Sequence, residues 1–248
     1  MSINDWVINL RSQVNPKLRV FCFPYAGGSA SIYTKWAEYF PPEVEIVAVQ
    51  PPGRASRVFE KPYTDMESLV NELFQKLVHS MDIPYIFFGH SLGSRVAFEL
   101  LNKINEHDIH LPVHFIASGS NPPDVYNKKS EIYRLSDAQF MIELEKFQGT
   151  SDEALQSNEL MNILLPGIKA DFEIANKYVF ESMVKHKCDL TVLGGTHDKD
   201  VDSQSLHNWS KFFSGSSKVE MIDGDHFFID SNRLKVVNEV VKIVNEIS

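Results

Sequence analysis

The stretch FFGHSLGSRVAFELL, from Phe87 to Leu101, decides the fold. It places Ser91 between an apolar run and a helical pattern, with Gly89 and Gly93 two positions to either side. A turn this tight forces its central residue into a strained conformation, and it brings the flanking backbone so close that a Cβ would collide. The pattern G-x-S-x-G between a strand and a helix is typical of a nucleophile elbow, which exposes the serine hydroxyl above the edge of a sheet.

Short apolar runs alternate with helical patterns along the chain. Because most of these runs are continuously apolar, they predict strands that are covered on both faces, as in a parallel sheet. The sequence therefore predicts an α/β fold, with a mostly parallel central sheet flanked by helices. The expected strands are 18–24, 44–50, 85–89, 113–119, 190–195 and 218–223, and the expected helices are 65–80, 92–105 and 234–247.

About seventy residues between the strands expected at 113–119 and 190–195 break this alternation. They contain helical patterns and no convincing strand, and they are far too long for an ordinary connection. Ser136 is expected to cap one helix, and residues 171–185 predict another. We expect residues 1–248 to form a single domain, with residues 124–187 inserted as a helical lid. The alternative is a structural elaboration without a gating role.

Composition narrows the class of protein. The chain has 248 residues and a net charge of −9, so the basic surface that nucleic acid or anionic lipid requires is not expected. No apolar stretch approaches the length of a membrane span, and the N-terminus does not resemble a signal peptide. Cys22 and Cys188, in or beside apolar runs, are expected to be buried thiols in a reducing compartment. We therefore predict a cytoplasmic protein with neither nucleic-acid nor membrane partners.

A reactive serine needs a base, and the base needs an acid that orients it. In the α/β-hydrolase fold these residues follow core strands in the order serine, acid, histidine. Asp198 and then His226 follow Ser91 in the chain, and each comes just after a predicted strand. They are the predicted acid and base, and Asp200 and Asp202 compete with Asp198 for the role of acid.

Two backbone N–H groups are predicted to hold the oxyanion of the transition state. One belongs to Leu92, at the start of the helix after the serine, where N–H groups are free. The other is expected in the segment YAGG after the first predicted strand, where Ala26 is the preferred donor and Tyr25 the neighbouring choice. An ordinary glycine turn is the alternative for this segment.

Six segments match the motifs of one enzyme family. They are FPYAGGSASIYTKW (23–36), VQPPGRASR (49–57), GHSLG (89–93), LLPGIKADFEIANKY (164–178), GGTHD (194–198) and GDHFFI (224–229). Together they resemble the type II thioesterases that serve non-ribosomal peptide and polyketide synthases, over nearly the whole chain. The chain departs from the family at Lys169, where an arginine is frequent, and at Pro51, where a leucine is common.

The resemblance implies an editing enzyme that hydrolyses acyl thioesters held on the phosphopantetheine arm of acyl or peptidyl carrier proteins. It implies the triad Ser91, Asp198 and His226, oxyanion donors at Ala26 and Leu92, a monomer, and neither a metal nor a cofactor of its own.

Docking of a carrier protein needs a local basic patch, because carrier proteins are usually acidic and this chain is acidic too. Lys128, Lys129 and Arg134 are the candidates, although a solvated loop would carry the same charges. We expect the docking to be weak and transient.

Three other functions compete with this interpretation. A carboxylesterase would share the fold, but such enzymes usually carry a different oxyanion loop, often H-G-G-G. A medium-chain fatty acyl thioesterase is separated poorly by sequence. A non-catalytic carrier-binding module would have no reason to keep serine, acid and histidine in the catalytic order.

Overall fold

A seven-stranded sheet forms the centre of the computed structural model, which describes residues 5–125, 131–147, 157–181 and 184–247. The strand order is β1-β3-β2-β4-β5-β6-β7, and β2 to β7 run parallel while β1 lies antiparallel to β3 at one edge. The predicted α/β fold with a mostly parallel sheet is confirmed. The strands are β1 (Val7–Arg11), β2 (Leu18–Phe23), β3 (Val44–Val49), β4 (Tyr85–His90), β5 (His114–Ser118), β6 (Asp189–Gly195) and β7 (Ser217–Ile222).

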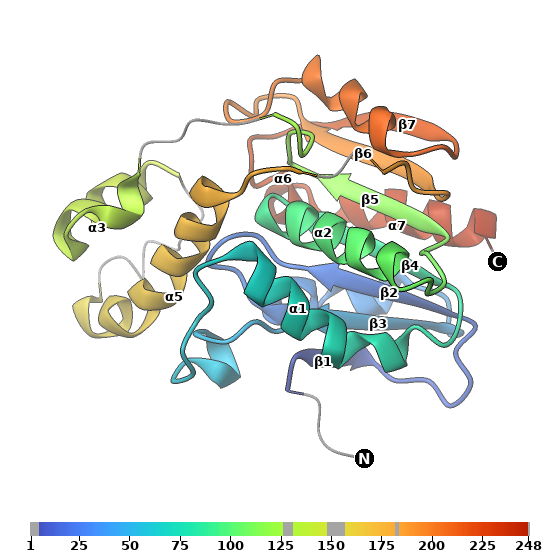
Figure 1. Ribbon diagram of the computed structural model, residues 1–248, viewed down its shortest axis with the longest axis horizontal. Coiled ribbons are helices and arrows are strands. Elements are labelled where there is room, and N and C mark those ends of the chain that lie inside the picture. Colours follow the sequence, from blue (N-terminus) through green and yellow to red (C-terminus); the bar gives the residue numbers. More distant parts are fainter. Residues whose placement is uncertain (1–4, 126–130, 148–156, 182–183, 248) are drawn as a thin grey trace.

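Helices cover both faces of this sheet, with α1 and α2 on one face and α7 on the other (Figure 1). The described α-helices are α1 (Met66–Leu77), α2 (Leu92–Glu106), α3 (Asp137–Glu145), α5 (Asn158–Lys177), α6 (Phe228–Ser231) and α7 (Arg233–Ile247). Short 3₁₀ helices are η1 (Ala30–Tyr33), η2 (Trp36–Tyr39), η3 (Ala55–Arg57), η4 (Val78–Ser80), η5 (Ile132–Arg134) and η6 (Ser205–Phe212). None of the described helices combines the length and the apolar character that crossing a bilayer needs.

Strand β2 shows why the strands read as unbroken apolar runs. Phe21 and Phe23 pack in the cluster formed with α1 and α2, whereas Val20 and Cys22 pack in the cluster formed with α7. Successive side chains of a strand point to opposite faces, so a sheet covered by helices on both sides needs apolar residues at every position. Cys188 is also buried, as expected for a thiol beside an apolar run.

The insertion between β5 and β6 carries α3 and α5, which lie beyond one end of the sheet (Figure 1). Ser136 caps α3 as predicted, because its hydroxyl accepts from the N–H of Gln139. These helices share a small apolar cluster of their own, formed by Ile132, Phe140, Leu144, Met161, Leu165 and Ile168.

The second predicted helix of the insertion, residues 171–185, is wrong in its bounds. Helix α5 begins at Asn158 and ends at Lys177, so the prediction covers only its last two turns. Pro166 and Gly167, ordinarily helix breakers, lie inside it. Gly167 is required there because a Cβ would lie 2.4 Å from the carbonyl oxygen of Gly53. Tight packing against the body of the protein therefore overrides local helix preference.

Candidate active site

Ser91 occupies the turn between β4 and α2 in a strained backbone conformation, with φ 54° and ψ −118°. A Cβ on Gly89 would lie 2.4 Å from the carbonyl oxygen of Gly93, and a Cβ on Gly93 would lie 2.2 Å from that of Phe23. Real Cβ atoms do not approach backbone so closely, which explains the glycine on each side of the serine. The turn has the geometry of the nucleophile elbow that the sequence predicts.

Hydrogen bonds to the neighbouring strand hold this elbow in place. The N–H of Ser91 donates to the carbonyl of Ser118 at the end of β5, at 2.8 Å. The buried hydroxyl of Ser94 donates to the carbonyl of Gly89 at 2.7 Å. Since strained backbone persists only where the surroundings over-determine it, these contacts keep the serine hydroxyl presented above the sheet.

The three residues predicted to act together lie in one hydrogen-bonded row. The Oγ of Ser91 is 2.9 Å from Nε2 of His226, and Nδ1 of His226 is 2.8 Å from Oδ2 of Asp198. They come from loops at the carboxyl ends of β4, β7 and β6, which meet at the same edge of the parallel sheet. The Asp198 side chain is 1% exposed and the His226 side chain 15%, so the row is largely shielded from water.

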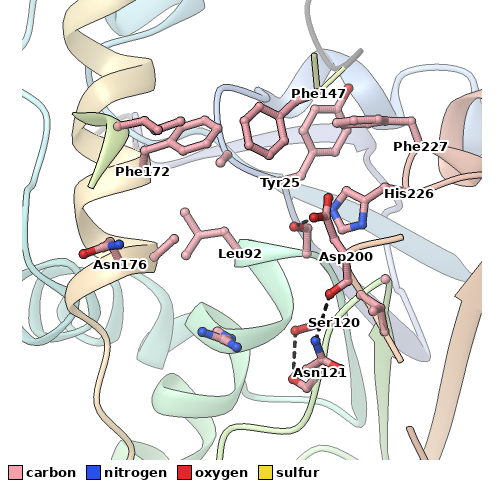
Figure 2. Close-up of a pocket in the computed structure, with 17 residues that line it drawn as sticks. Tyr25, Leu92, Ser120, Asn121, Phe147, Phe172, Asn176, Asp200, His226 and Phe227 are labelled. Atoms are coloured by element: carbon pink, nitrogen blue, oxygen red, sulfur yellow. Dashed lines mark hydrogen bonds between the residues drawn. The ribbon is translucent and has the colours of Figure 1, made fainter. Parts of the chain in front are cut away.

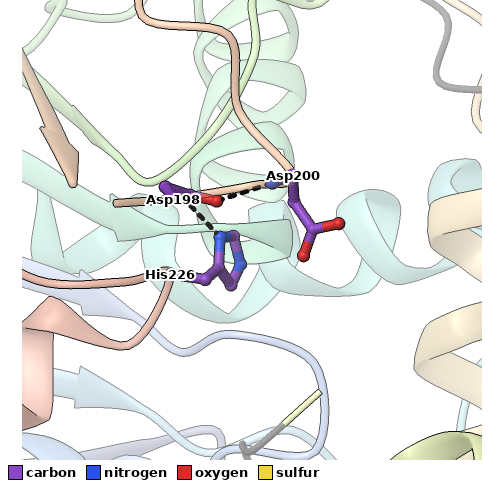
Figure 3. Close-up of side chains that lie close together, drawn as sticks. All are labelled: Asp198, Asp200 and His226. Atoms are coloured by element: carbon purple, nitrogen blue, oxygen red, sulfur yellow. Dashed lines mark hydrogen bonds and ion pairs between the residues drawn. The ribbon is translucent and has the colours of Figure 1, made fainter. Parts of the chain in front are cut away.

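Asp198 is distinguished from its neighbours by its contacts. Its Oδ1 accepts from the N–H groups of Asp200, at 2.8 Å, and Val201, at 3.2 Å, while Oδ2 faces the imidazole (Figure 3). Burial works against its ionisation, but the hydrogen bonds from His226 and from the two N–H groups prevail, and the pKa of Asp198 is lowered. Asp200 is exposed, and the Asp202 carboxylate accepts from the N–H of Gln204 in its own turn.

His90, the neighbour of Ser91 in sequence, does not point toward the serine hydroxyl. Its ring is buried and is 2.8 Å from the Ser118 hydroxyl and 2.9 Å from the carbonyl oxygen of His226. A carbonyl only accepts, so Nε2 of His90 must donate the proton. Burial lowers the pKa of His90 to about 3, which keeps the ring neutral. His90 thus holds the backbone of the loop that carries His226, a role that sequence reasoning missed.

The predicted oxyanion donors lie beside the serine. Ala26 and Leu92 line the same pocket as Ser91, and the N–H of Leu92 opens helix α2. The N–H of Gly28 donates to the carbonyl of Tyr25 at 2.8 Å, which closes a turn around Ala26, and Gly27 adopts φ 78°. Glycine tolerates this left-handed conformation without strain.

A pocket of about 210 Å³ opens above Ser91. Aromatic rings line one side, and Ser120 and Asn121 line the other (Figure 2). The aromatic residues are Tyr25, Phe147, Phe172 and Phe227. Phe147 and Phe172 come from the insertion, so the insertion forms part of the pocket wall.

A buried ion pair, which sequence reasoning did not predict, connects α5 to the oxyanion loop, the segment from Tyr25 to Gly28 that carries the predicted donor Ala26. Nη2 of Arg54 is 2.8 Å from Oδ1 of Asp171, and Nη1 of Arg54 binds the other carboxylate oxygen. The same carboxylate accepts from the N–H of Gly27 at 2.7 Å, and Arg54 donates to the carbonyl of Gly28 at 3.2 Å. Both residues lie in motifs that carry the family resemblance, PPGR and KADF, which was the available signal.

The structure describes Arg134, one of the three residues considered for carrier docking, and Lys169, which departs from the family pattern. Lys128 and Lys129 lie outside the described residues. Arg134 is exposed and pairs with Glu131 at 3.1 Å. Lys169 donates to the carbonyl of Leu135 at 2.8 Å and to Asp137 at 2.6 Å, so this lysine joins the two insertion helices.

Asp198, Asp200 and His226 also offer atoms that lie within 4.8 Å of one another, close enough to share a metal ion. The imidazole and the Asp198 carboxylate are, however, hydrogen-bonded to each other, and His226 uses its remaining nitrogen toward Ser91. The geometry of these side chains therefore suits proton transfer better than metal ligation.

Comparisons with known proteins agree with this geometry. The family model described as a thioesterase domain matches residues 18–247. The gramicidin S biosynthesis protein GrsT of Aneurinibacillus migulanus is 35% identical over 240 residues, which cover 97% of this chain and 94% of that protein. The structure of BorB, a type II thioesterase from the borrelidin biosynthetic cluster, is 30% identical, covers 96% of each chain and superposes with a TM-score of 0.88.

A second solved structure, ClbQ from the colibactin NRPS/PKS pathway, is 31% identical, covers 93% of this chain and 98% of its own, and also has a TM-score of 0.88. The resemblance drawn from the motifs is confirmed. The chain belongs to the thioesterase family and has the α/β-hydrolase fold of the type II thioesterases.

Proposed function

We propose that this protein is an editing thioesterase of non-ribosomal peptide or polyketide biosynthesis, which hydrolyses acyl groups from the phosphopantetheine arm of carrier proteins. The 2.9 Å contact between the Ser91 hydroxyl and Nε2 of His226 carries the proposal, because it gives the serine its base. The similarity to GrsT, BorB and ClbQ supports the biosynthetic setting.

In the first half of the reaction, Oγ of Ser91 attacks the thioester carbonyl while Nε2 of His226 takes the hydroxyl proton. The carbonyl oxygen becomes an oxyanion, which the N–H groups of Ala26 and Leu92 stabilise; each such donor contributes about 3 kcal/mol. The carbon–sulfur bond then breaks, and the imidazolium returns its proton to the departing thiolate. Asp198 holds the imidazole in the required tautomer and stabilises its charged form.

In the second half, water takes the place of the thiol. His226 removes a proton from the water, which attacks the acyl-serine ester, and the same two N–H groups hold the second oxyanion. Collapse of this intermediate releases a carboxylic acid and restores the hydroxyl of Ser91. A thioester suits this machinery because its carbonyl has weaker resonance than that of an ester and a thiolate leaves easily.

The remaining parts of the proposal concern the setting of this chemistry. Residues 1–248 act as one domain, and the inserted residues 124–187 cover the acyl group while it reacts. The protein works as a cytoplasmic monomer, without a cofactor of its own, and meets its carriers transiently. Arg134 is the described member of the docking patch proposed for the acidic carrier surface.

A direct comparison of substrates tests the function. We expect the purified protein to hydrolyse an acyl group from a phosphopantetheinylated carrier protein faster than it hydrolyses the matching oxyester of p-nitrophenol. A strong preference for the oxyester would favour a carboxylesterase instead. A fluorophosphonate probe should label Ser91 in the folded protein, and failure to label it would favour a non-catalytic binding module.

A further inference from the structure

One positive charge in the pocket has no described counter-charge. Arg95 lies on α2 one helical turn after Ser91, and it lines the same pocket. Within the described part of the chain, no carboxylate lies within 4.0 Å of its guanidinium, in contrast to Arg54 with Asp171. Charged side chains that lose water are normally paired, so an uncompensated guanidinium at a substrate pocket calls for an explanation.

The contacts that Arg95 makes with the described residues use few of its N–H donors. It donates to the carbonyl of Val125 at 3.3 Å, and its Cζ lies 5.2 Å from the centre of the Tyr178 ring. A guanidinium offers five N–H donors in a rigid fork that fits a carboxylate with two parallel hydrogen bonds. Partial burial lowers the pKa of Arg95, but an arginine keeps its charge in proteins.

Glu99, on the same helix as Arg95, and Asp200, in the same pocket, form no ion pair with it. Glu99, one turn further along α2, accepts from the Tyr178 hydroxyl and, at 3.1 Å, from the Asn102 amide. Burial raises the pKa of Glu99, which weakens it as a counter-charge. Asp200 also lines the pocket, but its side chain is exposed and forms no ion pair with Arg95.

Ser120 and Asn121, which line the same pocket, already form hydrogen bonds within the protein. The Asn121 amide donates to the carbonyl of Asp200 at 3.1 Å and accepts from Ser205 at 2.6 Å, and the Ser120 hydroxyl donates to the carbonyl of Asn121 (Figure 2). Compared with these two residues, Arg95 keeps several N–H donors available to a ligand in the pocket.

We propose that Arg95 binds a carboxylate on the acyl chain, so that carboxyacyl thioesters are favoured substrates of this enzyme. The inference rests on the proposed function and names its substrate class. Arg95 lies four positions after Ser91, a helical rise of about 6 Å, so an anion held there lies a few bonds from the reacting carbonyl. The phosphate of the carrier arm is separated from the thioester by the whole length of pantetheine, which makes the acyl chain the better source of the charge.

Matched thioesters of N-acetylcysteamine test the proposal. Glutaryl is compared with valeryl, and adipyl with hexanoyl, because each pair differs only in a terminal carboxylate in place of a methyl group. The wild-type kcat/KM should be higher for the carboxylates. Within each pair, the preference is the ratio of kcat/KM for the carboxyacyl thioester to kcat/KM for the neutral one. Arg95→Met should lower this ratio about tenfold or more, as expected for the loss of a charge-assisted hydrogen bond. It should leave kcat/KM of the neutral thioesters nearly unchanged. Arg95→Lys should keep part of the preference.

The control is Lys218→Met, which removes an exposed cation of β7 that does not line the pocket and should leave the ratio at its wild-type value. An equal loss on both members of a pair would overturn the proposal, because it would indicate altered pocket shape. Equal wild-type rates on both members would overturn it as well, while neutral thioester hydrolysis would leave the proposed function standing. If Arg95→Met instead removed a preference for valeryl-phosphopantetheine over valeryl-N-acetylcysteamine, the charge would come from the carrier arm and the acyl assignment would be wrong.

Discussion

The two walls of the pocket are held in place by different kinds of interaction. On the sheet side, Ser91, Asp198 and His226 sit on short loops whose backbone is hydrogen-bonded to neighbouring strands and loops. On the insertion side, α5 meets the body through a close approach of Gly167 to Gly53 and through a buried ion pair. Rigid backbone is suited to holding reacting atoms within fractions of an ångström, whereas side-chain contacts are suited to docking a separate layer over them.

The difference predicts two classes of variant. Changes to the three side chains on the sheet side should abolish chemistry while the fold survives, because the strands hold the loops without them. Changes at the junction with α5 should lower stability and also disturb the oxyanion loop. The Asp171 carboxylate both pairs with Arg54 and accepts from the N–H of Gly27 in that loop. The following variants test whether the two walls separate in this way.

Ser91→Ala gives the largest expected effect on catalysis. Removing the nucleophile should lower kcat about 10⁴-fold or more on an acyl-carrier substrate. Alanine meets the same backbone strain as serine at φ 54°, so the urea midpoint of unfolding should stay close to that of wild type. His226→Ala should behave similarly. Activity equal to wild type in Ser91→Ala would end the assignment of the nucleophile.

Asp198→Asn tests the acid of the row against its neighbour. The amide cannot hold the same imidazole tautomer, so kcat should fall about 10³- to 10⁴-fold, with a residual rate. Asp200→Asn is the matched control, because it alters an exposed carboxylate next to the row, and it should remain near wild-type activity. A dead Asp200→Asn beside an active Asp198→Asn would show that the acid was chosen wrongly.

The residues on the sheet side could be predicted from sequence because short, local patterns indicate them. The glycines around Ser91 follow from the geometry of one turn, and Asp198 and His226 follow directly from the ends of their strands. Strand β1 escaped prediction, since it is a short edge strand whose pattern is only partly buried. A half-exposed strand loses the continuous apolar signal of a central one.

The insertion side was harder to predict because its determinants lie far apart in sequence. Arg54 and Asp171 are 117 residues apart, so no local pattern indicates their pairing. Pro166 and Gly167 are residue types that ordinarily end a helix, whereas packing against Gly53 keeps both inside α5. Where a residue is chosen for a distant contact, local preference is misleading.

Asp171→Ala should give the largest loss of stability, because it leaves the buried Arg54 guanidinium without its counter-charge. Breaking such a pair lowers the free energy of unfolding by about 3–5 kcal/mol. The double variant Arg54→Met with Asp171→Leu should regain much of this stability while kcat stays low, since the N–H of Gly27 still lacks its acceptor.

Asp137→Ala is the control within the same insertion. It removes the exposed partner of Lys169 and should change the free energy of unfolding by at most about 1 kcal/mol. Urea unfolding and steady-state kinetics on the same preparations provide both measurements. Full recovery of kcat in the double variant would show that the carboxylate acts on stability alone and would remove the link between α5 and the oxyanion loop.

His90→Gln gives the smallest expected effect and tests the sheet side through pH. The pKa of His90 falls from its usual 6.5 to about 3 on burial, so the folded state binds fewer protons than the unfolded state between these values. Stability is therefore complete above pH 6.5 and decreases as the pH falls toward 3, by at most about 1.4 kcal/mol per pH unit from this ring. Glutamine can still donate to the carbonyl of His226 but does not titrate. The free energy of unfolding of His90→Gln, measured between about pH 7 and about pH 5, should therefore decrease less steeply than that of wild type.

His186→Gln is the control, because burial lowers the pKa of His186 to about 4 but its ring binds Asn102, away from the catalytic loops. Both variants should flatten the pH dependence, and only His90→Gln should also lower kcat, because only His90 holds the loop of the base. Parallel pH curves for wild type and His90→Gln would show that this ring is protonated in the folded protein, and the sheet side would then lose one of the contacts that make it rigid.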